Sequence, residues 1–271
     1  MVKEKDKMQN NNQNELNLTI LKTFLKTTLV VVVLFCMILT CGICLFPKQM
    51  AKACEKISLD GGKFLCYENV YKKSNSTANL YDLVNVSIET KKYDKTVKYI
   101  KALEEKTDYA KYIQSLDERA KQNTNIKYYA FVGDTDGYLQ SQKIYALCKS
   151  NSLEEAKNQA ILDLDSSNKY SFSLESYVIF MSQSEKNKAK LCDLFDELKN
   201  GERVRAKIAM RESALETESV DRFENVLRIY TLLKIQKTKY IVFEVCNDQV
   251  NMQICQNKIK ALQATYDNLI K

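Results

Sequence analysis

The segment Lys92–Leu103, with the sequence KYDKTVKYIKAL, sets the structural class that we expect for most of this chain. Its apolar residues recur at steps of four and three positions: Tyr93, Val97, Ile100 and Leu103. This spacing places them on one face of an α-helix, with polar residues on the other faces. Such a helix is stable only when its apolar face packs against a partner. The segment therefore predicts an amphipathic helix within a larger helical assembly.

The same periodicity returns throughout the C-terminal half. The stripes are Leu153, Ala156, Ala160 and Leu164; Leu191, Leu194, Phe195 and Leu198; Phe223, Val226, Leu227, Tyr230 and Leu233; and Cys255, Ile259, Leu262, Tyr266 and Leu269. The 271 residues include only 6 glycines and 1 proline, which disfavours folds with many tight turns. We therefore expect an all-α fold over residues 47–271.

The predicted helix starts recur along the chain. Residues suited to capping a helix occur near Asp60, Lys91, Asn123, Ser152, Ser184, Ser219 and Asp248. Their spacing of roughly 29–35 residues is typical of helix-turn-helix repeats. The segment from Ser152 to Glu155, SLEE, matches a capping box, in which the serine and glutamate side chains bind the first free amides of a helix.

Two segments carry a resemblance to a known family. KYDKTVKYIKAL at 92–103 resembles the second helix of a tetratricopeptide repeat (TPR), and SLEEAKNQAI at 152–161 is similar. The resemblance implies a TPR-like α-solenoid of helical hairpins, whose curved surface holds peptides or partner domains. The small residues of the family's first helices are mostly missing here, and no repeat closes with proline.

Three short runs favour an alternative α+β fold, because they are rich in aromatic and β-branched residues: Ile126–Val132, Tyr177–Met181 and Tyr240–Val245. Tyr177–Met181, the stripe at 191–198 and the segment 201–208 would form a strand-helix-strand unit. This unit resembles half of a SPOR-type peptidoglycan-binding domain. The alternative implies an envelope protein that binds a cell-wall glycan.

The stretch Thr27–Phe46, TTLVVVVLFCMILTCGICLF, is twenty residues without a charge and predicts a single transmembrane helix. Ahead of it, Gln9–Asn14 reads QNNNQN, a low-complexity polar stretch, and we expect residues 1–26 to form a disordered tail. Ala51-Lys52-Ala53 has the form of a signal-peptidase site, but the apolar run is longer than the about 7–15 residues of a signal-peptide core. We expect an uncleaved anchor with a cytoplasmic N-terminus and an extracytoplasmic C-terminal domain.

Six of the nine cysteines lie beyond the apolar stretch. In an oxidising compartment they could form three disulfides, and proximity in sequence favours Cys54 with Cys66 and Cys246 with Cys255. The alternative is that they are small buried apolar residues.

The sequence contains no histidine, which excludes Ser-His-Asp and Cys-His nucleophiles and histidine-ligated zinc. We find no nucleotide-binding motif, no pattern for a metal or other cofactor, and no basic stripe with interleaved aromatic residues for nucleic acid. We therefore expect a membrane-anchored scaffold or adaptor that binds protein partners and has no catalytic residues. The glycan-binding module is the alternative.

Overall fold

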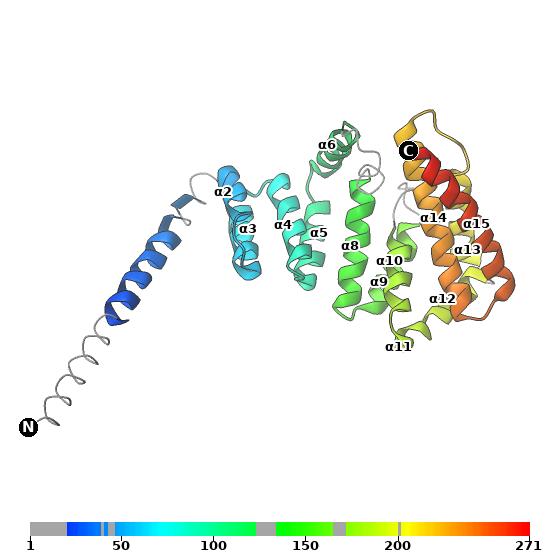
Figure 1. Cartoon of the computed structure of the whole chain (residues 1–271), viewed down its shortest axis with the longest axis horizontal. Coiled ribbons are helices and arrows are strands. Elements are labelled where there is room, and N and C mark those ends of the chain that lie inside the picture. The colour runs from blue at the N-terminus through cyan, green and yellow to red at the C-terminus, as the bar shows by residue number, and fades with distance from the viewer. Residues whose placement is uncertain (1–20, 39–40, 43–46, 123–133, 165–171, 200–201) are drawn as a thin grey trace, which may run out of the picture. The chain divides into compact units, whose positions relative to one another are not determined.

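A computed structural model describes residues 21–38, 41–42, 47–122, 134–164, 172–199 and 202–271 (Figure 1). These residues form helices and no strand, so the fold of the described chain is all-α. Beyond an N-terminal helix, Leu21–Ile38, the helices are α2 (Pro47–Cys54), α3 (Asp60–Ser74), α4 (Thr77–Glu89), α5 (Tyr93–Glu104), α6 (Tyr109–Lys121), α8 (Thr135–Lys149), α9 (Leu153–Asp163), α10 (Ser173–Ser182), α11 (Glu185–Lys188), α12 (Leu191–Lys199), α13 (Glu202–Ala214), α14 (Arg222–Val245) and α15 (Gln249–Leu269).

The chain divides into two compact units, Met1–Asn79 and Leu80–Lys271. In the first unit, the helix Leu21–Ile38 has a mean hydropathy of 2.0 and no buried residue. Among the described residues it is the one helix long and apolar enough to cross a membrane. Residues 21–26 of the predicted disordered tail belong to this helix, so the tail prediction is wrong there, while residues 1–20 lie outside the described residues. Residues 39–40 and 43–46 of the predicted span also lie outside them.

The rest of the first unit is built on α2 and α3, which pack against each other and are joined by a disulfide between Cys54 and Cys66. Both cysteines are buried, together with Phe64 and Val70. The Ala51-Lys52-Ala53 segment lies within α2, immediately before the disulfide.

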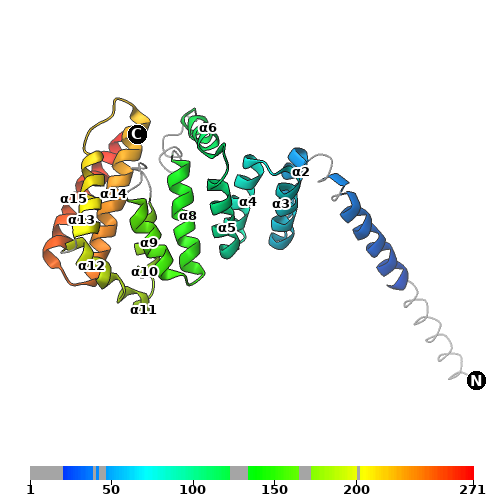
Figure 2. The same cartoon turned by 180° about the vertical axis from the view of Figure 1, so that it is seen from behind.

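In the second unit, helices that are not consecutive along the chain pack side by side. α5 packs on α8, α8 on α10, and α10 on α14, while α9 and α15 each pack on the helix that precedes them (Figures 1 and 2). The main core lies among α8, α9, α10, α12, α13 and α14, where Tyr177, Met181 and Leu194 are almost completely buried. The predicted stripes on α5, α9, α12, α14 and α15 supply buried or half-buried residues, which confirms the periodicity.

Three helix-to-helix connections share one turn geometry. Lys91, Asn151 and Asn247 have positive φ angles of 56°, 63° and 57° and follow the ends of α4, α8 and α14. At each turn the next amide donates to a carbonyl five residues earlier, as Ser152 N does to Leu147 O at 2.9 Å. This is a Schellman motif, usually built with glycine. The repeated turn shows how a chain with 6 glycines forms several helical hairpins.

We expect Lys91→Gly to stabilise the protein by about 0.5–1 kcal/mol. The left-handed conformation costs a non-glycine residue about 1–2 kcal/mol, and the extra backbone entropy of glycine cancels only part of that gain. The measurement is urea unfolding of the full chain in detergent, followed by circular dichroism. Lys92→Gly is the control, because Lys92 has an ordinary φ of −87° and should give no gain. Equal shifts in both variants would contradict the explanation.

The strand predictions are wrong where the structure tests them. Tyr177–Met181 lies in α10 and Tyr240–Val245 lies in α14, while Ile126–Val132 lies outside the described residues. The α10 run is apolar because the helix contacts α8, α9, α12 and α14, so nearly every face is covered. A helix that is apolar all round is a buried helix. The SPOR-like unit is therefore not supported, since residues 202–208 of its third segment also lie in a helix, α13.

The predicted capping box at the start of α9 is also wrong. Ser152 is the N-cap residue, but its side chain makes no capping hydrogen bond. Glu155 instead forms an ion pair with Lys101 of α5, with 3.1 Å between Nζ and Oε1. Side-chain caps form elsewhere, with Asp134 at α8, Asp221 at α14, Asp248 at α15, and Ser76 at α4, whose Oγ accepts from Asn79 N at 3.2 Å.

Candidate functional site

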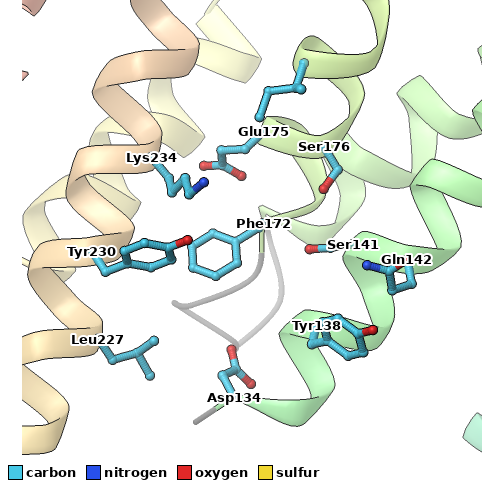
Figure 3. A pocket seen from close by; sticks show the side chains of 11 residues that line it. Asp134, Tyr138, Ser141, Gln142, Phe172, Glu175, Ser176, Leu227, Tyr230 and Lys234 are labelled. Carbon is cyan, nitrogen blue, oxygen red and sulfur yellow. The ribbon is translucent and has the colours of Figure 1, made fainter. Parts of the chain in front are cut away.

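A cavity of about 240 Å³ lies between α8, α10 and α14 and is called the aromatic cavity below (Figure 3). The helices that line it are those that pack on one another through the middle of the second unit. Its walls are formed by Asp134, Tyr138, Ser141, Gln142, Phe172, Glu175, Ser176, Ile179, Leu227, Tyr230 and Lys234. Aromatic and aliphatic side chains supply most of this surface, which is typical of binding sites.

The aromatic wall is centred on Tyr230 of α14. Its ring meets that of Phe172 edge-to-face, with 5.6 Å between centroids, and lies 5.8 Å from the ring of Tyr266 on α15. Lys234 is one helical turn further along α14, so its ammonium group reaches over the same ring at 5.2 Å from the centroid. The wall therefore combines an apolar surface with one positive charge.

A buried carboxylate forms another part of the wall. Glu175 of α10 is 2% exposed, and its Oε1 accepts a hydrogen bond of 2.9 Å from Arg211 of α13, which is 5% exposed. The second oxygen, Oε2, is buried and has no hydrogen-bond partner among the described residues. Figure 3 shows Lys234 extending from α14 toward this carboxylate. The ion pair with Arg211 fixes the position of Glu175 beside the cavity.

An open depression of about 630 Å³ adjoins the aromatic cavity and is called the acidic depression below. It lies between α6, the start of α8 and the start of α14, and it shares Asp134 and Leu227 with the cavity. Five carboxylates and one lysine are among its lining residues, which are Tyr109, Ala110, Ile113, Gln114, Asp117, Glu118, Lys121, Asp134, Asp136, Glu224 and Leu227. The two hollows adjoin at Asp134 and Leu227 and are together called the groove below; one has a mostly apolar surface and the other is lined by carboxylates.

Hydrogen bonds between α6 and α8 hold the acidic depression in shape. Asp117 Oδ1 accepts from Thr135 N at 2.9 Å and from Thr135 Oγ1 at 2.5 Å, and the Tyr109 hydroxyl donates to Asp136. Burial raises the pKa of Asp117, and the two bonds from Thr135 oppose that shift. Burial also raises the pKa of Tyr109, and its bond to Asp136 raises it further. Tyr109 therefore remains a proton donor at neutral pH.

The arrangement suits binding. Within the described ranges, no group of three or more Cys, Asp or Glu side chains is placed to hold a metal ion. The side chains around the groove include aromatic rings, carboxylates and two lysines, Lys234 in the aromatic cavity and Lys121 in the acidic depression. These groups recognise apolar and charged surfaces.

The four cysteines that we expect from the sequence to form disulfides have three different environments in the structure. Cys54 and Cys66 form the disulfide between α2 and α3. Cys246, at the end of α14, lies 3.2 Å from Cys192 of α12, measured between the sulfurs, and is not beside its predicted partner. Cys255 is buried in α15 as a free thiol. Burial raises its pKa.

The groove has no signature in the sequence. Tyr230 belongs to an amphipathic stripe like any other, and nothing in the sequence around Glu175 or Lys234 marks them as lining residues. The groove is formed by α6, α8, α10 and α14. A single sequence does not show which of these helices are neighbours or which faces they present to one another. The sequence of α10 gives no local hint either, because Ile179, which is 40% exposed at the cavity, is as apolar as the fully buried Val178 before it.

Comparison with models of protein families, with curated proteins and with solved structures finds no match to this chain. The resemblance to tetratricopeptide repeats therefore depends on the two helical segments alone.

Proposed function

We propose that this protein is a membrane-anchored scaffold or adaptor whose helical domain binds a segment of a partner protein in the groove. The partner places one apolar or aromatic side chain in the aromatic cavity and basic side chains over the acidic depression. The helical hairpins act as a TPR-like array that presents the groove. The observation that carries the proposal is that an aromatic cavity and a carboxylate-lined depression adjoin each other and share Asp134 and Leu227.

The size of the cavity favours a side chain of a larger partner over a free small molecule. Pockets that bury drug-sized ligands measure about 300–1,000 Å³, and the aromatic cavity of about 240 Å³ is below that range. Protein interfaces often depend on one aromatic or aliphatic anchor in a desolvated pocket, surrounded by polar contacts. A cavity of this size beside a broad open depression fits that pattern.

Charge favours a basic partner segment. Carboxylates outnumber cations five to one around the acidic depression. Complementary charge speeds encounter and suppresses wrong partners more than it adds affinity. The cavity itself offers the ammonium group of Lys234, which would donate to polar atoms of the anchored residue.

The location of the domain is part of the proposal. The helix Leu21–Ile38 supports a single membrane span, and the Cys54–Cys66 disulfide supports an oxidising compartment on the C-terminal side. The groove would then face a partner outside the cytoplasm.

Photocross-linking tests the groove. With Ile179 replaced by p-benzoylphenylalanine, irradiation of native membranes should give one discrete protein adduct, because this position lines the cavity. Mass spectrometry of the adduct should map the cross-link to a segment with basic residues. The same amino acid at Met210, which is 73% exposed on α13, is the control and should give none. A glycan adduct, equal adducts at both positions, or none at either would contradict the proposal.

Charge reversal tests the acidic depression. Glu118→Lys should reduce the yield of the adduct from position 179 at least about threefold, because it places a cation where we expect the partner's basic side chains. Glu118 is exposed, so the change should not disturb folding. Glu244→Lys reverses an exposed charge on α14 outside the groove and should leave the yield unchanged. An equal loss in both variants would indicate a general effect of net charge.

A further inference from the structure

A pair of cysteines outside the groove is placed for a reaction that the proposed function does not use. Cys192 lies near the start of α12 and Cys246 is the C-cap residue of α14, and their sulfurs are 3.2 Å apart. A disulfide bond measures about 2.05 Å, so small rotations of the two side chains would close the gap. The pair lies in the second unit, far along the chain from the Cys54–Cys66 disulfide.

Two further contacts fix α12 against the end of α14 and the turn that follows. The rings of Phe195 and Phe243 meet edge-to-face with 5.8 Å between centroids. Lys199 Nζ lies 2.9 Å from Asp248 Oδ2, at the N-cap of α15. Phe195 and Lys199 follow Cys192 along α12, so the three contacts lie along one seam. The packing holds the two sulfurs together whether or not they are bonded.

The two thiols differ in access. Cys192 is exposed, so an oxidant reaches it from solvent. Cys246 is half-buried. Its pKa is raised to about 12, mainly by burial and to a smaller extent by its contact with Cys192. Cys246 is therefore protonated at neutral pH, and the first attack on an oxidant falls to Cys192. Cys148 and Cys255 are buried, so solvent oxidants do not reach them easily.

We propose that Cys192 and Cys246 are a site of disulfide formation that ties α12 to the turn between α14 and α15. The oxidant is a disulfide, such as oxidised glutathione. The Cys192 thiolate attacks one sulfur of the oxidant, forms a mixed disulfide and releases one glutathione thiolate. Cys246 then loses its proton to solvent and attacks Cys192 Sγ, which releases the second glutathione. Two protein thiols become one disulfide while one oxidised glutathione becomes two reduced molecules.

The bond would link residues 54 positions apart. Closing a loop of that size lowers the conformational entropy of the unfolded chain, and this raises the free energy of unfolding. For a unit of this size we expect oxidation to raise the thermal midpoint by about 5–10 °C. Because the seam is outside the groove, photocross-linking from position 179 should be unaffected. Failure of this proposal is therefore distinguishable from failure of the proposed function.

Mass spectrometry of the full chain in detergent tests the site. The Cys255→Ser variant is treated with oxidised glutathione, alkylated and digested with trypsin, so that the peptide 240–258 contains Cys246 as its one cysteine. We expect it to be linked to the peptide 191–199. In Cys246→Ser the second step is blocked, and Cys192 should instead carry a glutathione adduct.

The Cys54–Cys66 pair is the internal control for oxidation in the same digest. If that disulfide is present while Cys192 and Cys246 are both alkylated in Cys255→Ser, the proposal is wrong. A bond between Cys246 and Cys255 in the native sequence would also overturn it. Proteolysis with an enzyme that cuts before Asp248 separates those two cysteines and would show such a bond.

Discussion

Arg211→Met is expected to destabilise the second unit by about 3–5 kcal/mol, the largest loss that we predict for a single substitution. Arg211 is 5% exposed and is the ion-pair partner of Glu175, which is 2% exposed. Methionine fills much of the same space but leaves the Glu175 carboxylate buried without its ion-pair partner. Since whole domains are stable by only about 5–15 kcal/mol, this loss is a large fraction of the total.

Urea unfolding of the full chain in detergent, followed by circular dichroism, would measure the loss. Arg205→Met removes an exposed arginine from the same helix and should change the stability by less than about 0.5 kcal/mol. Adding Glu175→Gln to Arg211→Met removes the stranded charge and should restore part of the loss. If Arg211→Met and Arg205→Met behaved alike, or if the second substitution restored nothing, the buried charge would not be the cause.

The helices could be predicted from sequence because their signal is local. A stripe such as Phe223, Val226 and Leu227 reports which face of α14 is covered, and the structure buries that face. The low number of glycines also favoured a helical fold. It did not show that asparagine and lysine would occupy the left-handed positions of the turns. That choice depends on backbone geometry after the helix ends, for which residue type is only a weak guide.

The strand predictions failed because composition alone does not distinguish a buried strand from a short buried helix. Tyr177 and Val178 are covered because α10 is central, and an apolar run of five residues has no periodicity to separate the two structures. The groove could not be predicted for a different reason. Glu175, Tyr230 and Lys234 come together only when α10 packs on α14.

We predicted a disulfide between Cys246 and Cys255 from their nearness in sequence, but both are free thiols in the structure. Nearness in sequence is a poor guide to distance in space when a stretch of helix separates two residues. Cys246 ends α14, the chain turns at Asn247, and Cys255 lies within α15. At 1.5 Å per residue, α15 carries Cys255 roughly 10 Å away from the turn. Cysteines with Cα atoms more than about 7 Å apart cannot be bridged without moving the backbone. Cys192 is far away in sequence but lies on the adjacent helix, and it is the neighbour in space.

The N-terminal helix gives the second large prediction. Replacing both Val32 and Phe35 with arginine should move the protein from the membrane pellet to the soluble fraction after carbonate extraction. The helix Leu21–Ile38 has 18 residues and rises about 27 Å, close to the thickness of a hydrocarbon core. Arginine at the centre of a span costs about 2.5–3.5 kcal/mol per residue, so two should prevent insertion.

Two controls separate membrane insertion from other causes of sedimentation. Lys22→Arg with Lys26→Arg leaves the charge at the end of the helix unchanged, so this variant should stay in the pellet. The intact mass of the native protein tests whether the helix is retained, because cleavage after Ala53 would leave a chain that begins at Cys54. A native chain starting at Cys54 and found in the soluble fraction would show that the helix is a signal sequence, and the anchor in the proposed function would be lost.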